Sequence, residues 1–216
     1  MTSFFYNVFK LLLLLILPFV LLIRGSIFFH TNFAWNSWVC LGAGVGVTAV
    51  VLFIYFSFFY GTLTGRFGDF DAMKRRALIA ILVVLLYSGY GILFFSNANL
   101  KSTALQNEMS NLHPVLRLSL STLVFMDKDL LITDASRVPE DYKKMGLKTL
   151  KNSLHYKQPS TGYTHAVDLR TSGRDELKNT LVTWYFRLMG FRTLRHVGTG
   201  DHLHVSLLSH DVPGAR

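Results

Sequence analysis

The hydrophobic pattern divides this chain into an apolar first part and a mixed second part. Residues 25–65 and 77–100 contain no Lys, Arg, Asp or Glu. Uncharged apolar runs of this length are typical of helices that cross a membrane. The pattern therefore predicts spans at about residues 4–24, 34–60 and 77–95, and it excludes a plain cytosolic globule.

The first apolar run has a second interpretation. Its most apolar part, residues 11–23, has the character of the hydrophobic region of a secretory signal peptide. No small-x-small cleavage site follows it, because the next residues are Arg24, Gly25 and then Ser-Ile-Phe-Phe. We therefore expect an uncleaved span.

The basic residues near the spans predict the orientation of the chain. The loop between the second and third spans carries Arg66 and the cluster at residues 74–76, whereas the loop between the first and second spans carries only Arg24. Loops rich in Lys and Arg stay in the cytoplasm. We expect an inner (cytoplasmic) membrane protein with its N-terminus inside and its C-terminal domain periplasmic or extracellular.

The second span has a face of small residues. Gly42, Gly44 and Gly46 follow one another at every second position. Small residues let membrane helices approach closely. This face predicts helix–helix partners within the membrane.

Beyond the spans, a polar linker at residues 97–112 leads to a predicted domain at residues 113–216. Apolar periodicity and turn residues predict helices at 114–125, 139–150 and 174–189 and strands at 129–134, 165–170, 191–197 and 202–208. The last two strands are joined by Gly198, Thr199 and Gly200, which predict a hairpin. The expected fold is a small α+β domain whose antiparallel sheet has helices on one face.

The excess of basic residues indicates which kinds of molecule the chain could bind. The chain has 22 basic and 13 acidic residues, and seven of its eight histidines lie beyond residue 96. A basic outer domain suits an anionic partner, such as a lipid surface or a cell-wall polymer. The sequence contains no arginine-rich run or aromatic RNA-binding motif, which argues against nucleic acid. Its single cysteine, Cys40, excludes a disulfide scaffold.

Three short patterns in the second part carry groups that suit a metal site. An arginine, Arg137, follows the first predicted strand. A Ser-x-His motif ending at His155 precedes an Ala-x-Asp motif ending at Asp168, and Asp201 stands three residues before His204. Two imidazoles and a carboxylate match the three protein ligands of a catalytic zinc site, whose fourth position is left for water.

This ordered set resembles the superfamily of zinc peptidases that includes D-alanyl-D-alanine carboxypeptidases, L-alanyl-D-glutamate endopeptidases and the Hedgehog signalling domain. The resemblance covers about residues 112–208 and implies the Hedgehog/DD-peptidase-like fold. By resemblance, His155, Asp168 and His204 would bind Zn²⁺, Asp201 would act as the catalytic base, and Arg137 would hold a substrate carboxylate. An Asp at the position of the base is more similar to the endopeptidase branch.

The chain departs from the family pattern between the first two ligands. His155 and Asp168 are thirteen residues apart, which is further than in the family, and the added residues around 157–162 have loop composition. His165 is the nearest substitute for His155. It stands three positions before Asp168 on a predicted strand, where the two side chains would point to opposite faces, so we prefer His155.

His202 stands two residues before His204 on the last predicted strand. Residues at this spacing share one face of a strand. His202 would therefore line the cleft as a substrate-binding residue that helps to stabilise an oxyanion, or it would simply be exposed.

These observations predict one of two functions. The first is a membrane-anchored zinc metallopeptidase that acts on peptidoglycan stem peptides through a metal-activated water. The second is a non-catalytic peptide-binding or partner-binding subunit of a membrane assembly that keeps the peptidase-like fold, because three spans are more than a simple tether needs. Zinc content and cleavage of cell-wall fragments would distinguish the two.

Overall fold

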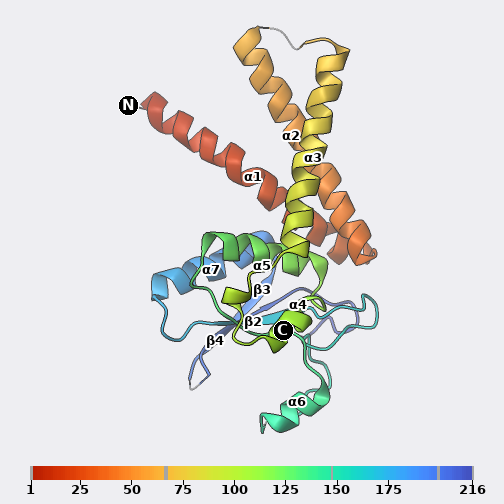
Figure 1. The fold of residues 1–216 in the computed structure, drawn as a ribbon, viewed down its shortest axis with the longest axis vertical. Helices are drawn as coiled ribbons and strands as arrows, with labels where there is room; N and C mark the ends of the chain where they lie inside the picture. Colours follow the sequence, from red (N-terminus) through yellow and green to blue (C-terminus); the bar gives the residue numbers. More distant parts are fainter. Residues whose placement is uncertain (1, 66–67, 147, 199, 216) are drawn as a thin grey trace. The chain divides into compact units, whose positions relative to one another are not determined.

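The structure is a computed structural model that describes every residue except 1, 66–67, 147, 199 and 216. The chain forms two compact units, Met1–Tyr90 and Gly91–Arg216 (Figure 1). Arg66 of the predicted basic loop, residue 147 of a predicted helix and Thr199 of the predicted hairpin lie outside the described residues.

The N-terminal unit consists of long apolar helices. They are α1 (Thr2–Phe33), α2 (Ser37–Thr64) and α3 (Phe70–Leu93). Segments of 18, 28 and 24 residues within them are long and apolar enough to cross a membrane. The prediction of a membrane protein with three candidate spans is confirmed at this level.

Local capping explains where the second and third helices begin. The Asn36 side chain accepts a hydrogen bond from the Trp38 backbone N–H at 2.9 Å, and α2 ends at Gly65, whose φ is 66°. The Asp69 side chain accepts one from the Ala72 backbone N–H at 2.8 Å. Because side-chain oxygens satisfy the free N–H groups of a first helical turn, α3 begins several residues before the predicted apolar run.

The glycine face of α2 contains one close contact. A Cβ atom added to Gly44 would lie 2.6 Å from the carbonyl oxygen of Leu22 in α1. Around Gly42 and Gly46, such an atom would meet nothing within 4 Å among the described residues. Of these three glycines, only Gly44 is therefore required for the packing of α1 on α2.

The C-terminal unit contains a four-stranded antiparallel sheet. Its elements are η1 (Asn97–Asn99), α4 (Ala104–Met109), α5 (Pro114–Met126), β1 (Ile132–Asp134), α6 (Pro139–Lys144), β2 (Ala166–Arg170), α7 (Glu176–Met189), β3 (Arg192–His196) and β4 (His202–Ser206). The strand order is β1-β2-β4-β3. The small antiparallel sheet expected from the sequence is confirmed.

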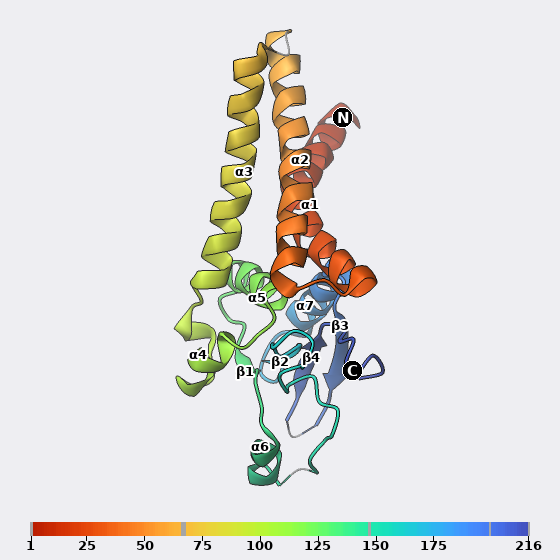
Figure 2. The same ribbon diagram turned by 90° about the vertical axis from the view of Figure 1, so that its right-hand side faces the viewer.

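The two faces of the sheet differ in what covers them. Figures 1 and 2 show α5 and α7 together on one side of the sheet. Arg195 of β3 contacts Glu176 of α7, so the odd-numbered residues of β3 face the helices. Antiparallel pairing gives the same side to Leu203, which is buried, and the opposite side to His204. The α5–α7 layer therefore covers one face of the sheet, and polar side chains such as His204 lie on the other face.

Two segments differ from their predicted form. The predicted polar linker contains η1 and α4, and its Leu105, Met109 and Leu112 are buried. The predicted helix 139–150 ends as α6 at Lys144, followed by Gly146 with a φ of 68°. A positive φ at glycine is a common way for a helix to end, and residues 148–150 lie outside any helix.

Candidate metal centre

Three buried side chains from separate segments meet on the sheet face away from α5 and α7. Asp168 on β2 is the register partner of His204 on β4, and His155 comes from the loop before β2. Each of the three residues is at most 8% exposed. Their ligand atoms lie close enough together to hold one metal ion.

The spacing of the three donor atoms fits tetrahedral coordination. His155 Nε2 lies 3.3 Å from His204 Nδ1 and 3.4 Å from Asp168 Oδ1, and the last two atoms are 2.8 Å apart. Ligand atoms about 2.0–2.1 Å from a tetrahedral zinc ion are separated by about 3.3–3.5 Å. Two of the three separations therefore match directly, and the third requires the carboxylate to move by about 0.5 Å.

Hydrogen bonds hold His155 with a lone pair directed at the cluster. Its Nδ1 lies 2.8 Å from the carbonyl oxygen of Ala135, to which it donates. The backbone N–H of His155 donates to Ser153 Oγ, which in turn lies 2.7 Å from the Tyr142 hydroxyl. A backbone carbonyl that takes the other ring N–H is the usual support of a metal-bound histidine.

The residues that separate His155 from Asp168 in the sequence form a folded loop. The Gln158 backbone N–H donates to the Tyr163 carbonyl at 2.9 Å, and Gly162 adopts a φ of 74° at the turn. The buried Gln158 side chain donates to the Ser153 carbonyl. These contacts close the insertion on itself, so His155 still reaches Asp168.

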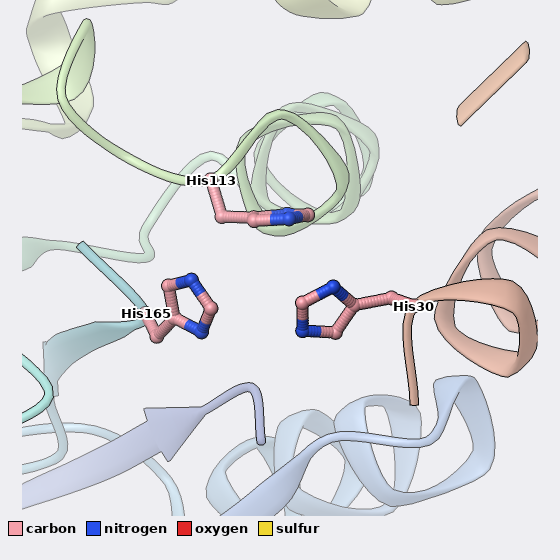
Figure 3. Close-up of side chains that lie close together, drawn as sticks. All are labelled: His30, His113 and His165. Carbon is pink, nitrogen blue, oxygen red and sulfur yellow. The ribbon is translucent and has the colours of Figure 1, made fainter. Parts of the chain in front are cut away.

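The alternative ligand His165 points elsewhere. Its ring nitrogens contact Thr161 Oγ1 at 2.8 Å and the Leu208 carbonyl at 3.1 Å. Its ring centroid lies 5.0 Å from that of His113, the residue before α5 (Figure 3). The structure thus brings His155, and not His165, to Asp168.

Arg137 lies beside the cluster and already has anionic partners. Its Nε donates to Asp134 at 2.9 Å and its Nη2 donates to Asp168 Oδ2 at 2.8 Å. Its side chain is 15% exposed. Burial lowers the pKa of Arg137, but the two carboxylates outweigh burial and raise it. The guanidinium is therefore a fixed positive charge against the back of the Asp168 carboxylate.

Asp168 is held in its ionised form. Burial raises its pKa, but the adjacent His155 and His204 lower it more, and the result lies well below the usual value for Asp. A carboxylate that stays ionised in a buried site is ready to bind a cation.

His204 has a buried ring nitrogen with an unmet hydrogen-bonding capacity. Among the described residues, none accepts from or donates to its Nε2. Buried polar atoms are nearly always satisfied in native proteins. Nε2 is not one of the three donor atoms of the cluster, so this orphaned atom is available to a ligand other than the metal.

Asp201 is not brought to the three ligands. Both oxygens of its carboxylate pair with Arg195, at 2.8 and 2.9 Å, and Oδ1 also accepts from Thr171. The Arg195 hydrogen bonds lower the Asp201 pKa to about 2. Since Arg195 faces the helix layer, Asp201 lies on the other side of the sheet from His204. Its predicted role as base would require it to leave Arg195.

His202 does lie beside the cluster, as its spacing from His204 predicts. Its Nε2 is 3.9 Å from Asp168 Oδ2. Its ring stacks on that of His196, with centroids 4.7 Å apart. His196 is not among the candidate residues that the sequence predicts. The hairpin could have identified it, since the residues paired across the β3–β4 turn are 196 with 202 and 194 with 204.

A cavity of about 500 Å³ adjoins His204 along the edge strand β3. Its lining includes Arg187, Arg192, Leu194 and Ser206. Two guanidinium groups beside a polar cluster suit a ligand that carries carboxylates. The cavity is a candidate binding site for such a ligand.

Comparisons of the chain with protein-family models, with curated proteins and with solved structures give no match.

Proposed function

We propose that the C-terminal unit binds zinc through His155, Asp168 and His204, and that the chain is a membrane-anchored zinc metallopeptidase acting on peptidoglycan stem peptides. The observation that carries this proposal is the set of three buried donor atoms, two of whose three separations match tetrahedral spacing. Two imidazoles with one carboxylate are a ligand set typical of catalytic zinc, which keeps a fourth position open.

A zinc ion in this site would supply a water of near-neutral pKa and would polarise a substrate carbonyl. The chain's own residues would balance the charge of the site and bind the substrate. Arg137 balances the charge of Asp168, and His202 stands at the open side of the cluster, where it would bind substrate. Arg187 and Arg192 in the adjoining cavity would hold the carboxylates of a stem peptide by paired hydrogen bonds.

The identity of the base follows from the resemblance and not from the contacts. Asp201 would have to exchange its bidentate partner Arg195 for the reacting water, because a base must be within hydrogen-bond reach of the proton that it takes. Arg137 would likewise have to release Asp134 to hold a substrate carboxylate. The proposed activity therefore includes a rearrangement of both ion pairs when substrate binds.

These same two ion pairs favour the alternative function. With Arg137 and Asp201 each engaged by a partner in the chain, the unit would bind metal and peptide without cleaving it. It would then serve as a non-catalytic subunit of a membrane assembly. For either function, the basic cluster at residues 74–76, which lies in the first turns of α3, supports an orientation with the C-terminal unit outside the cytoplasmic membrane.

The test uses the full chain purified in detergent. Bound metal is measured by inductively coupled plasma mass spectrometry, and digestion of purified peptidoglycan fragments is followed by mass spectrometry of the products. His155→Gln should lose both metal and cleavage, whereas His210→Gln, at an exposed histidine, should keep both. Metal without cleavage would support the binding subunit, and a wild-type chain that takes up no zinc would overturn both functions.

A further inference from the structure

An apolar stripe runs along the exposed side of α7. It consists of Leu177, Leu181, Trp184 and Leu188, which are 53–68% exposed. Spacings of four, three and four residues place these side chains on one side of a helix. Val182 and Phe186 are buried. The helix thus has two apolar faces, and the C-terminal unit covers only one of them.

The stripe continues onto the end of α5. Phe125 and Met126 are 70% and 76% exposed. They directly precede Asp127, whose carboxylate pairs with Arg174 at 2.5 Å, just before α7 begins. The ion pair brings the end of α5 to the start of α7, and we call the exposed apolar residues of the two helices together the α7 surface.

Basic side chains border the α7 surface. Lys178 and Arg187 lie on either flank of the stripe, each about 90° from its centre by helical spacing, and Lys178 also pairs with Asp129 at 2.7 Å. Residues 97–216 carry 16 basic and 11 acidic groups, which gives the region a net charge of +5. Long basic side chains beside an apolar helix face are typical of helices that lie in a membrane interface, because their charged ends reach the lipid phosphates.

The chain enters this unit next to α5. Ser121 Oγ donates to the carbonyl oxygen of Gly91, in the last turn of α3, at 2.5 Å. The Tyr185 hydroxyl of α7 donates to the Ser119 carbonyl of α5 at 2.8 Å. These hydrogen bonds join the last turn of α3, from Gly91 on, to α5 and α7 within the C-terminal unit, and α3 is itself a candidate membrane span.

We propose that the α7 surface lies in the interface of the same bilayer that the N-terminal helices cross, with Trp184 and its neighbouring leucines among the upper acyl chains. The occupant is a phospholipid surface that contains anionic headgroups. Trp184 suits this depth because its ring is apolar and its indole N–H reaches the headgroup level. This contact involves none of the three proposed metal ligands and would hold the C-terminal unit flat on the membrane.

The test is depth-dependent quenching of Trp184 fluorescence in the full chain. The chain has three tryptophans, so Trp35→Phe and Trp38→Phe leave Trp184 alone. The protein is reconstituted into phosphatidylcholine–phosphatidylglycerol vesicles with bromine at shallow or deep acyl positions. We expect a blue-shifted emission and at least about twofold stronger quenching by shallow than by deep bromine, because an interfacial helix lies about 5–10 Å into the headgroup–acyl boundary.

A matched control moves the tryptophan. In the same background, Trp184→Phe combined with Leu150→Trp places the indole at an exposed site in the loop after α6, where quenching should be weak. As a second measurement, the spectrum of the otherwise unmodified protein minus that of Trp184→Phe should show the same depth profile as Trp184 alone.

Equal Trp184 emission in brominated and plain vesicles would overturn the proposal. So would quenching in the Leu150→Trp control that is as strong as the quenching of Trp184. Leu181→Cys in a Cys40→Ser background tests for a second copy of the chain on the same surface. Efficient disulfide cross-linking between chains at that position would overturn the lipid proposal and would show that a second copy of the chain covers the α7 surface.

Discussion

Replacing Asp168 by Asn tests the centre of the candidate metal site with little change in shape. The carboxylate accepts from Arg137 through Oδ2 and from His204 through Oδ1, both at 2.8 Å. An amide cannot accept at both positions, so one donor would lose its partner. Breaking a buried ion pair costs about 3–5 kcal/mol. Because Arg137 keeps Asp134 at 2.9 Å, we expect the lower end, about 3 kcal/mol.

For a unit of this size, about 3 kcal/mol corresponds to a fall in Tm of about 12 °C. The metal contributes separately. Zinc at a free concentration of about 100 times its Kd stabilises the folded state by about 2.7 kcal/mol, or about 10 °C. Wild-type protein in detergent should show this upward shift on addition of zinc, and Asp168→Asn should not. The assay is thermal unfolding followed by near-ultraviolet circular dichroism, with and without zinc.

The matched control is Asp211→Asn, which removes the same charge from an exposed carboxylate and should keep the zinc shift. His155→Gln leaves the Arg137–Asp168 pair in place, so it should lose the zinc shift with a smaller change in the metal-free Tm. The reasoning is refuted if Asp168→Asn keeps the full zinc shift, or if the wild type shows none.

Three further variants test the fold around the site. Asp201→Asn should lower the Tm at pH 7. Because the Arg195 pair lowers the folded pKa of Asp201 to about 2 from 3.8, its stabilisation is fully present above pH 3.8 and is lost as the pH falls through 2, so the Tm difference should shrink to zero below that pH. Phe186→Ala, which removes a fully buried ring beside Phe191, should cost about 3–5 kcal/mol in urea unfolding. Gly44→Leu should reduce helicity and thermal stability in detergent, measured by far-ultraviolet circular dichroism, whereas Gly42→Leu, in open space, should not.

The sequence predicted elements well where local signals were strong. Pro114 marked the start of α5, and Gly190, with a φ of 102°, ends α7 as expected. The predicted helix beyond Lys144 failed because no apolar periodicity held those residues against the core, and Gly146 ended the helix early. Local propensity places an element, but packing decides how far it extends.

The candidate site shows why side-chain partners are harder to predict. The convergence of His155 and Asp168 could be anticipated, although the insertion between them made their distance uncertain from sequence alone. The strand alternation that separates His165 from Asp168 also separates Asp201 from His204, since both pairs are three residues apart. Arg195, the partner of Asp201, could not be identified before the register of the β3–β4 hairpin was known.

The register between β2 and β4 has a consequence for folding. Asp168 and His204 face each other only in one alignment of these strands. A slip of one residue would turn one of them toward the helix layer and leave Val167 or Val205 on the polar face. In a refolding experiment, the amount of zinc bound would therefore report the fraction of molecules in which β2 and β4 have the native register. Bound zinc would also bias the sheet toward that alignment, because a metal that binds only the native arrangement stabilises it over misaligned forms.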